Sequence, residues 1–318
     1  MINFNILRCI NCDTDGNFTI SNDDYIKCSQ CFSEFRYINS RPLMVNSDFQ
    51  GYSNLVESAL KLKSRDLSGH INYWDQSIDP QKFFFKYLFP KCNKLDLQWK
   101  FLGHKVSLMA QGIYSNSNKN TIVLDVGAGD ARYGAFFKKN TYVSTDLVFS
   151  SERHNFDNID IISDVEKLSI ANDYADYILN FALMEHVPHP DLVVKEMFRT
   201  LKKGGKIFSI IPLTRPEHMQ PFDFFRFTQF SIRKLFSENG FKVESIKGSN
   251  NALWTPVHYL NMVCLSYPFE NFKNRIYAVL INRIFFILLF PLVYIARKFD
   301  KYFPDNFPIY YWVECEKK

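Results

Sequence analysis

The residues best suited to chemistry lie in the stretch TIVLDVGAGDARYGAFF, at residues 121–137. An apolar run contains the acid Asp125, and Gly127 and Gly129 follow it before a helix-like segment. Glycine loops between a strand and a helix let backbone amides approach a bound nucleotide. The G-x-G-x-x-G pattern of pyrophosphate loops is incomplete, because Arg132 stands at the third glycine position. The stretch predicts a nucleotide site and leaves open which nucleotide it holds.

Asp125 helps to choose between the ligands. A carboxylate at this strand end would repel a pyrophosphate, whereas it would suit an ammonium group such as that of S-adenosylmethionine. Asp146, Asp164 and Asn180 end or follow the next predicted strands, where ligands of open α/β sheets bind. Asp164 alone is read equally well as a helix cap. Asp146 would also suit the ribose of NAD, so an NAD-dependent oxidoreductase stays as an alternative that Asp125 disfavours.

Apolar strand runs alternate with helical patterns from residue 121 to about 248, which predicts a parallel sheet covered by helices. The strands are expected at 121–126, 141–146, 159–163, 175–181, 206–212 and 241–247. Helices are expected at 190–205, with Gly204–Gly205 as the stop, and at 231–240. Residues 47–118 look mainly helical and aromatic-rich.

Four of the seven cysteines form two close pairs, Cys9-x2-Cys12 and Cys28-x2-Cys31. Two intervening residues let both sulfurs of a pair reach one ion, and two pairs complete a closed tetrahedron. In a chain without an export signal this pattern favours a metal over disulfides. The spacing predicts a structural Zn²⁺ that clips a region too small to be stable easily alone. The alternative is four unligated thiols.

Length and composition bound the remaining possibilities. The chain has 318 residues, 47% of them apolar, which suffices for a main domain of about 200 residues with smaller additions. The net charge of +5 is spread along the chain and falls short of a nucleic-acid-binding signature. The N-terminus lacks the basic start and long apolar run of a signal peptide, so a cytoplasmic protein is expected.

Residues 121–248 resemble the class I S-adenosylmethionine-dependent methyltransferases, of the UbiE/UbiG-like type known as methyltransferase type 11. The resemblance rests on VLDVGAGDARYGAFF, STDL, SDVEKLSIANDYADYILNFALMEHV and LKKGGKIFSIIP. It implies an α/β, Rossmann-like sheet of seven strands whose last strand is antiparallel. The segment IYYWVECEK at 309–317 fits that last strand, so residues 249–308 would be an apolar insertion.

The segment YIKCSQCFSEFRYINSRPLMV resembles the second half of a Trm112-like zinc ribbon. It departs from that family after the cysteine pairs, where Asp13 and Phe32 replace the usual Pro and Gly. The resulting domain expectation is a ribbon at 1–46, a helical cap or linker at 47–118 and a methyltransferase domain at 119–318.

The methyltransferase resemblance also implies roles for single residues. The expected cofactor contacts are Asp125, Gly127, Ala128 and Gly129 at the methionine end, Asp146 and Leu147 at the ribose, Asp164 and Val165 at the adenine, and Asn180 and Phe181 at the sulfonium. Methyl transfer is an in-line displacement in which alignment supplies much of the rate. A hydroxyl or acidic carbon as acceptor additionally needs a base.

The acceptor side is expected after the fourth and fifth strands. The catalytic candidates are His186, His218 and Asp223, and the acceptor-binding candidates are His189 and Arg226. The stretch PLTRPEHMQPFDFFRFT at 212–228 resembles methyltransferases of bacterial surface-glycan biosynthesis. This favours a small-molecule or glycan acceptor, such as a sugar hydroxyl of a surface polysaccharide or lipid-linked precursor. The alternatives are a salt bridge between Asp223 and Arg226 that merely closes a loop, and local packing of His186.

Two further functions and one membrane hypothesis stay open. RNA methylation would use the ribbon to contact RNA, and a catalytically inactive protein would keep only S-adenosylmethionine binding. Residues 284–296, IFFILLFPLVYIA, lie between Arg283 and Arg297 and are shorter than the roughly 20 residues of a bilayer span. They predict either a buried or dimer-contact helix or an interfacial helix that holds the enzyme on the inner face of a membrane.

Overall fold

The computed structural model describes residues 3–63, most of 105–148, 156–266, single positions between 284 and 296, and 298–318. Within the expected helical region 47–118, α1 (Tyr52–Leu60) is a helix, and the described positions from 105 to 113 are helical. The remainder of that expectation, and most of 284–296, lie outside the described residues. None of the described helices has the length and apolar character needed to cross a membrane.

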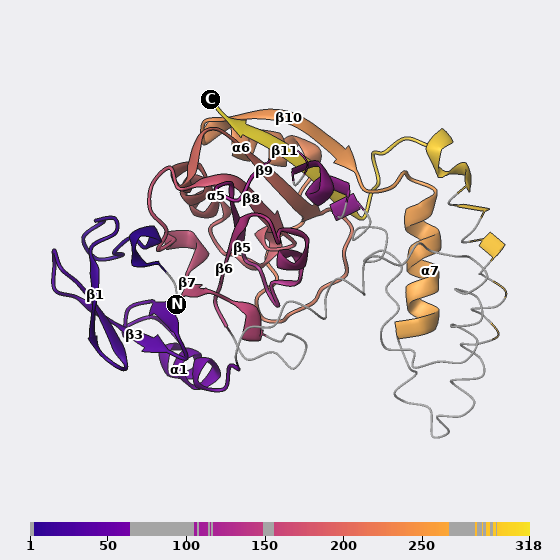
Figure 1. Ribbon diagram of the computed structural model, residues 1–318. Coiled ribbons are helices and arrows are strands. Elements are labelled where there is room, and N and C mark those ends of the chain that lie inside the picture. The colour runs from indigo at the N-terminus through magenta and orange to yellow at the C-terminus, as the bar shows by residue number, and fades with distance from the viewer. Residues whose placement is uncertain are drawn as a thin grey trace, which may run out of the picture.

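Eleven strands form one sheet in the order β1-β2-β3-β4-β7-β6-β5-β8-β9-β11-β10 (Figure 1). Their bounds are β1 Phe18–Asn22, β2 Tyr25–Cys28, β3 Glu34–Ile38, β4 Arg41–Met44, β5 Ile122–Val126, β6 Thr141–Asp146, β7 Ile161–Ser163, β8 Ala175–Phe181, β9 Leu201–Pro212, β10 Phe241–Gly248 and β11 Tyr310–Lys317. The part from β7 to β10 has a Rossmann-like α/β arrangement, and β11 runs antiparallel to both of its neighbours, as expected for the last strand.

The expectation of a seven-stranded sheet is wrong, because the four strands of the N-terminal region continue the sheet beyond β7. Strand β4 pairs in parallel with β7, with Leu43 opposite Ile162. A parallel strand edge presents unpaired amides and carbonyls, which any added strand can satisfy. Figure 1 shows these indigo strands at one side of the molecule, with β10 and β11 toward the other.

The N-terminal strands also share their core with the rest of the sheet. Leu7 forms a bridge with Ile170, and both belong to the hydrophobic cluster that contains Leu124 of β5. The buried guanidinium of Arg41 donates to the carbonyl oxygens of Ile159, at 2.7 Å, and Asp157, at 2.5 Å. The N-terminal region therefore does not depend on a core of its own.

The helices begin and end close to the expected positions, with one exception. The described helices after β8 are α5 Pro190–Thr200, α6 Gln229–Glu238 and α7 Trp254–Ser266; the 3₁₀ helices are η1 Phe4–Ile6, η4 Arg132–Phe136, η5 Phe156–Asn158, η6 Val165–Lys167, η7 Met184–His186 and η8 Asp300–Tyr302. The helix expected at 190–205 ends at Thr200, because buried Leu201 is already extended and pairs with Ala175. The glycines expected to stop it lie within β9, where the strand register shifts.

Candidate active site

The glycine loop follows β5 directly and is held against β6. The backbone amides of Gly127 and Ala128 donate to the carbonyl oxygen of Thr145, at 3.0 and 3.1 Å. Gly127 has a φ of +72° and Gly129 a φ of +59°, a region that glycine adopts most readily. A Cβ atom on Gly127 would lie 2.6 Å from the side chain of Leu183. Both the backbone conformation and this close approach therefore call for glycine at position 127.

Two acidic side chains, Asp125 and Asp146, lie next to this loop. Asp125 is only 1% exposed, and the Tyr142 hydroxyl donates to it at 2.5 Å. Asp146 accepts a hydrogen bond from the amide of Gly129 at 2.8 Å. Burial raises the pKa of each carboxyl to about 7. The acid expected at the methionine end is thus bonded to a tyrosine inside the protein.

The other expected cofactor residues lie at the carboxyl ends of neighbouring strands. Asp164 follows β7 and accepts from the amide of Glu166 at 2.9 Å, so it does cap η6, and burial raises its pKa. Asn180 donates to the carbonyl of Val126 at 3.3 Å, while its buried Oδ1 accepts no hydrogen bond from the residues that the structure describes. Phe181 packs edge-on against Tyr133. Leu147 and Val165 directly follow Asp146 and Asp164.

A second group forms where β8 and β9 end, and we call its members Glu185, His186 and His218 the Glu–His–His group. Nε2 of His186 lies 3.8 Å from Oε1 of Glu185, and Nε2 of His218 lies 4.0 Å from the same atom. One ligand atom from each of the three residues lies within 4.8 Å of the others. Glu185 was not among the expected site residues, although it directly precedes His186 in the sequence. Its burial and its contact with a distant histidine gave no sequence signal.

Glu185 has an environment unlike that of the other acids. Its side chain is 0% exposed, and neither carboxylate oxygen accepts a hydrogen bond within the described structure. Burial raises its pKa to about 8. His218 is displaced in the other direction: burial and the neighbouring His186 lower its pKa to about 4. His218 is therefore neutral near pH 7.

The salt bridge between Asp223 and Arg226 is present. Arg226 donates to both carboxylate oxygens, at 2.7 and 2.8 Å, and thereby lowers the pKa of Asp223 to about 2. Asp223 also accepts from the backbone amide of His218 at 2.8 Å. The pair thus fixes the loop that carries His218. His189, by contrast, is exposed at the start of α5 and does not join the Glu–His–His group.

The four cysteines of the N-terminal region come together as expected. The Sγ atoms of Cys9 and Cys31 are 3.6 Å apart, those of Cys12 and Cys28 are 3.7 Å apart, and all four lie within 4.8 Å of one another. Zinc–sulfur bonds of about 2.3 Å place the corners of a tetrahedron roughly 3.8 Å apart, whereas a disulfide needs about 2.05 Å. The cluster is therefore compatible with a zinc site.

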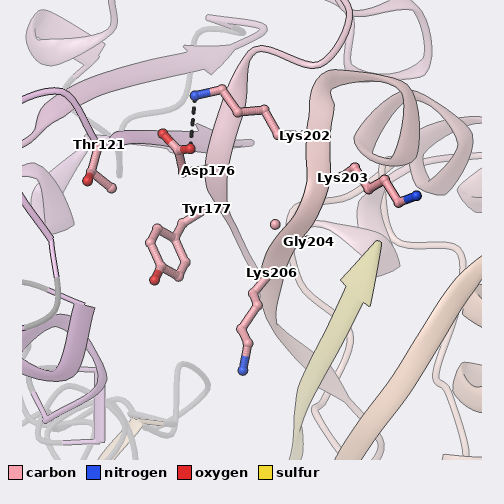
Figure 2. Close-up of a pocket in the computed structure, with 8 residues that line it drawn as sticks. Thr121, Asp176, Tyr177, Lys202, Lys203, Gly204 and Lys206 are labelled. Atoms are coloured by element: carbon pink, nitrogen blue, oxygen red, sulfur yellow. Dashed lines mark hydrogen bonds and ion pairs between the residues drawn. The ribbon is translucent and has the colours of Figure 1, made fainter. Parts of the chain in front are cut away.

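A hollow of about 270 Å³ lies elsewhere, near the amino ends of β5 and β8 (Figure 2). Thr121 and Asp176 line it together with Lys202, whose Nζ lies 2.9 Å from Asp176 Oδ1. The amino and carboxyl ends of parallel strands lie at opposite edges of a sheet. This hollow is therefore separate from the glycine loop and the Glu–His–His group.

Comparison with known proteins finds a similarity over the segment that contains the glycine loop. A family profile described as a methyltransferase domain matches residues 98–246. A search among curated proteins gives no match.

Solved structures with a related fold have low sequence identity. One described as a methyltransferase from Bacillus halodurans shares 19% identity over 44% of this chain and 70% of its own, with a TM-score of 0.37. One described as a sarcosine dimethylglycine methyltransferase from Galdieria sulphuraria shares 15% over 68% and 86%, with a TM-score of 0.45. A complex of the Trm112 methyltransferase activator with a methyltransferase from Haloferax volcanii shares 13% over 66% and 93%, with a TM-score of 0.40. These similarities are too low to assign an acceptor.

The matched segment contains the glycine loop and the strand ends that carry Asp125, Asp146, Asp164 and Asn180. A domain of this family uses S-adenosylmethionine as its methyl donor. Residues 98–246, just under half of the chain, are therefore similar to a methyltransferase domain, and this similarity supports S-adenosylmethionine-dependent methyltransferase activity.

Proposed function

We propose that the enzyme methylates a hydroxyl of a small-molecule or glycan acceptor, such as a sugar hydroxyl of a surface polysaccharide or lipid-linked precursor. The observation that carries this proposal is the Glu–His–His group. It lies after β8 and β9, and β8 also carries Asn180 among the proposed cofactor residues. A hydroxyl is a weak nucleophile and needs groups of this kind, whereas an amine would not.

The residues at the ends of β5 to β8 fit S-adenosylmethionine. The glycines at 127 and 129 leave the loop without side chains, and the unpartnered Oδ1 of Asn180 offers a buried acceptor. We assign the methionine end to the loop with Asp125, the ribose to Asp146 and the adenine to Asp164. When bound, S-adenosylmethionine supplies a methyl group already activated by a sulfonium.

The acceptor hydroxyl is assigned to the side of His186 and His218. His218 is neutral near pH 7 because its pKa is about 4, so its ring can act on a hydroxyl as a base or as a ligand. Two interactions hold the loop in place: the backbone amide of His218 donates to Asp223, and Arg226 forms a salt bridge with Asp223. We assign Asp223 and Arg226 to this positioning.

The loop after β9 adds an apolar rim that suits a sugar or a lipid-linked sugar. Its exposed apolar side chains are Met219, Phe222, Phe224 and Phe225. Exposed aromatic rings are unfavourable in water and commonly line ligand sites, where they stack on flat apolar faces. The rim and His218 belong to the same loop, and Nδ1 of His186 lies 2.6 Å from the carbonyl oxygen of Phe222 in that loop, which links acceptor binding to acceptor activation.

The acceptor proposal is tested by transfer of a radiolabelled methyl group to candidate substrates. We expect incorporation into a polysaccharide precursor fraction and none into RNA, with a product mass increased by one CH₂ unit. The variant His218→Asn should keep S-adenosylmethionine binding in calorimetry and lose the transfer. Incorporation into RNA instead would favour the alternative in which the ribbon contacts RNA.

We further propose that Cys9, Cys12, Cys28 and Cys31 hold a structural Zn²⁺. The sulfur separations support this, and so do the turns after each pair, where Asp13 and Phe32 have φ values of +58° and +63°. Elemental analysis of purified protein should find zinc bound, and Cys28→Ser should lose it. Because β4 pairs with β7, the loss should also raise amide exchange in β7.

The region at 284–296 supports a peripheral membrane contact. Among its described positions, Ile284, Leu288, Leu292 and Ile295 are helical and exposed. Their spacing of four, four and three residues places them on one helix face, and Arg283 and Arg297 flank the stretch in the sequence. We propose that this face rests on anionic lipid. Flotation with anionic vesicles should fail for Leu288→Ser/Leu292→Ser; equal flotation of that variant and the wild type would contradict the proposal.

A further inference from the structure

The starting point is the buried side chain of Glu185, whose two carboxyl oxygens accept no hydrogen bond from the described residues. A buried polar group that lacks partners costs about 1–3 kcal/mol, and a charged one costs more. Most buried carboxylates therefore accept hydrogen bonds, as Asp125 and Asp146 do here. The oxygens of Glu185 face two imidazole rings instead. This arrangement calls for a partner that lies between the three side chains.

The backbone determines which nitrogen of each imidazole faces Glu185. Nδ1 of His186 lies 2.6 Å from the carbonyl oxygen of Phe222, and Nδ1 of His218 lies 2.9 Å from that of Pro216. A carbonyl oxygen can only accept, so each Nδ1 carries the proton. In a neutral ring Nε2 is then the acceptor atom, and Nε2 is the atom near Glu185 Oε1. Two ring nitrogens with lone pairs and the carboxyl group of Glu185 thus lie within 4.8 Å of one another.

This tautomer is the one that metal-binding histidines use. Histidine ligands usually donate their other ring N–H to a carbonyl or carboxylate, which fixes the ring and makes the ligating nitrogen more basic. Oδ2 of Asp223 also lies 3.5 Å from Nδ1 of His218. Asp223 in turn forms a salt bridge with Arg226. The Glu–His–His group therefore has an ordered set of supporting residues.

We propose that Glu185, His186 and His218 bind a divalent transition-metal ion, which in turn binds the acceptor hydroxyl. Ligands at about 2.0–2.2 Å from one ion can be no more than about 4.4 Å apart. The separations of 3.8 and 4.0 Å from Glu185 Oε1 lie within that limit. Two imidazoles and one carboxylate suit zinc, iron, manganese or cobalt and leave coordination positions open for an oxygen of the acceptor.

The chemical role rests on the proposed function and completes its proton balance. A bound divalent ion lowers the pKa of a coordinated hydroxyl, so that the hydroxyl proton passes to solvent water. The oxygen then forms a bond to the methyl carbon while the carbon–sulfur bond breaks. The sulfonium leaves as the neutral thioether S-adenosylhomocysteine, and the acceptor leaves as a methyl ether. The step needs no oxidant or reductant.

The test is binding of Co²⁺ to the full-length protein. Purified protein is first dialysed against a chelator that removes weakly held metal, and Co²⁺ is then added while visible absorption and calorimetry are followed. A nitrogen–oxygen site gives weak visible bands without the intense near-ultraviolet charge transfer of a thiolate site. The variant is Glu185→Gln, and the matched control is Glu217→Gln, which alters an exposed glutamate beside His218.

We expect the wild type and Glu217→Gln to show the nitrogen–oxygen bands with one equivalent of Co²⁺, and Glu185→Gln to lose them. A second variant, His218→Asn, should lose them as well, and thermal melts show that each variant is folded. Absence of the bands in folded wild type, or their persistence in folded Glu185→Gln, overturns the proposal. If Co²⁺ binds as expected and no hydroxyl acceptor is methylated, the metal site stands and the proposed function fails.

Discussion

The glycine loop and the Glu–His–His group differ in whether their acidic side chains accept hydrogen bonds. In the loop, Asp125 accepts from Tyr142 and Asp146 accepts from the amide of Gly129. In the Glu–His–His group, the carboxyl group of Glu185 is fully buried and accepts no hydrogen bond within the described structure. The two loop acids thus have donors within the protein, whereas the carboxyl group of Glu185 calls for a bound partner.

The difference also lies in how the two regions are assembled. The loop acids are 21 positions apart in the sequence and lie on adjacent parallel strands, β5 and β6. The Glu–His–His group joins a 3₁₀ turn after β8 to a loop after β9, more than 30 residues further on. A satisfied carboxylate contributes to folding, while an unsatisfied one lowers stability and is retained where it serves a site. Four experiments test this difference between the two regions.

The largest expected effect is on cofactor affinity. Asp125→Ala removes the loop's buried acid and leaves the Tyr142 hydroxyl without its acceptor. We expect S-adenosylmethionine affinity to fall by roughly 100-fold, about 2.7 kcal/mol, while the cysteine cluster stays folded. Isothermal calorimetry measures the affinity, and Asp125→Asn serves as the variant that keeps an acceptor for Tyr142. Unchanged affinity in Asp125→Ala would show that the acid serves the fold alone.

The next change makes the loop resemble the Glu–His–His group. Tyr142→Phe keeps the ring stacked on Phe137 but removes the hydroxyl that donates to the Asp125 carboxyl group at 2.5 Å. We expect the free energy of unfolding to fall by about 1–3 kcal/mol, because a buried carboxyl is left unsatisfied. Urea denaturation measures this, with Tyr177→Phe on β8 as the control. An equal loss in both variants would trace the effect to tyrosine in general.

The reverse change removes the unsatisfied acid. Glu185→Met replaces the buried carboxylate with an apolar side chain of similar length, and should raise the unfolding free energy of metal-free protein by about 1–2 kcal/mol. Methyl transfer should be lost. Glu217→Met, at an exposed site, should change neither quantity. A decrease in stability on Glu185→Met would mean that the carboxylate is already satisfied in solution.

The smallest change is in the pH dependence of stability. Burial raises the pKa of folded Asp125 to about 7, above its ordinary value of 3.8, and nearby Asp146 and Asp130 act in the same direction while Tyr142 opposes them. The folded state thus binds more protons than the unfolded state, so this group lowers stability as pH rises between these values. The difference between the wild type and Asp125→Asn should change by roughly 1.4 kcal/mol from pH 5 to pH 6. A pH-independent difference in urea melts would mean that Asp125 is ionised throughout this range.

Much of the central fold was predictable because its signals are local. The six expected strands from 121 to 247 all form, and the first five, β5 to β9, are the apolar runs that specify buried parallel strands, whereas β10 pairs antiparallel with β11. The end of α5 was misplaced by five residues, from 205 to 200. Gly204 and Gly205 lie within β9 at a shift of the strand register, and the strand pairing of Leu201 with Ala175 decides where the helix stops.

Some residues of the candidate site could also be predicted from local sequence, and others could not. Gly127, Gly129, Asp146 and the four cysteines could be selected from spacing alone, because each motif is held by one turn or one strand end. Glu185 could not, because its importance comes from lacking hydrogen bonds and from facing a histidine 33 positions away. Asp223 was expected as a catalytic candidate, and its bond to Arg226 instead favours a positioning role.

The glycine loop, the order of strands and helices around it and the two Cys-x2-Cys motifs follow from local sequence, because short-range sterics and hydrophobic period act on neighbouring residues. Long-range folding, in contrast, makes the N-terminal strands extend the sheet through β4 and β7 and brings Glu185, His186 and His218 together. These contacts depend on which strand edge remains open and on how two distant loops fold over the same strand ends. No local pattern encodes either of them.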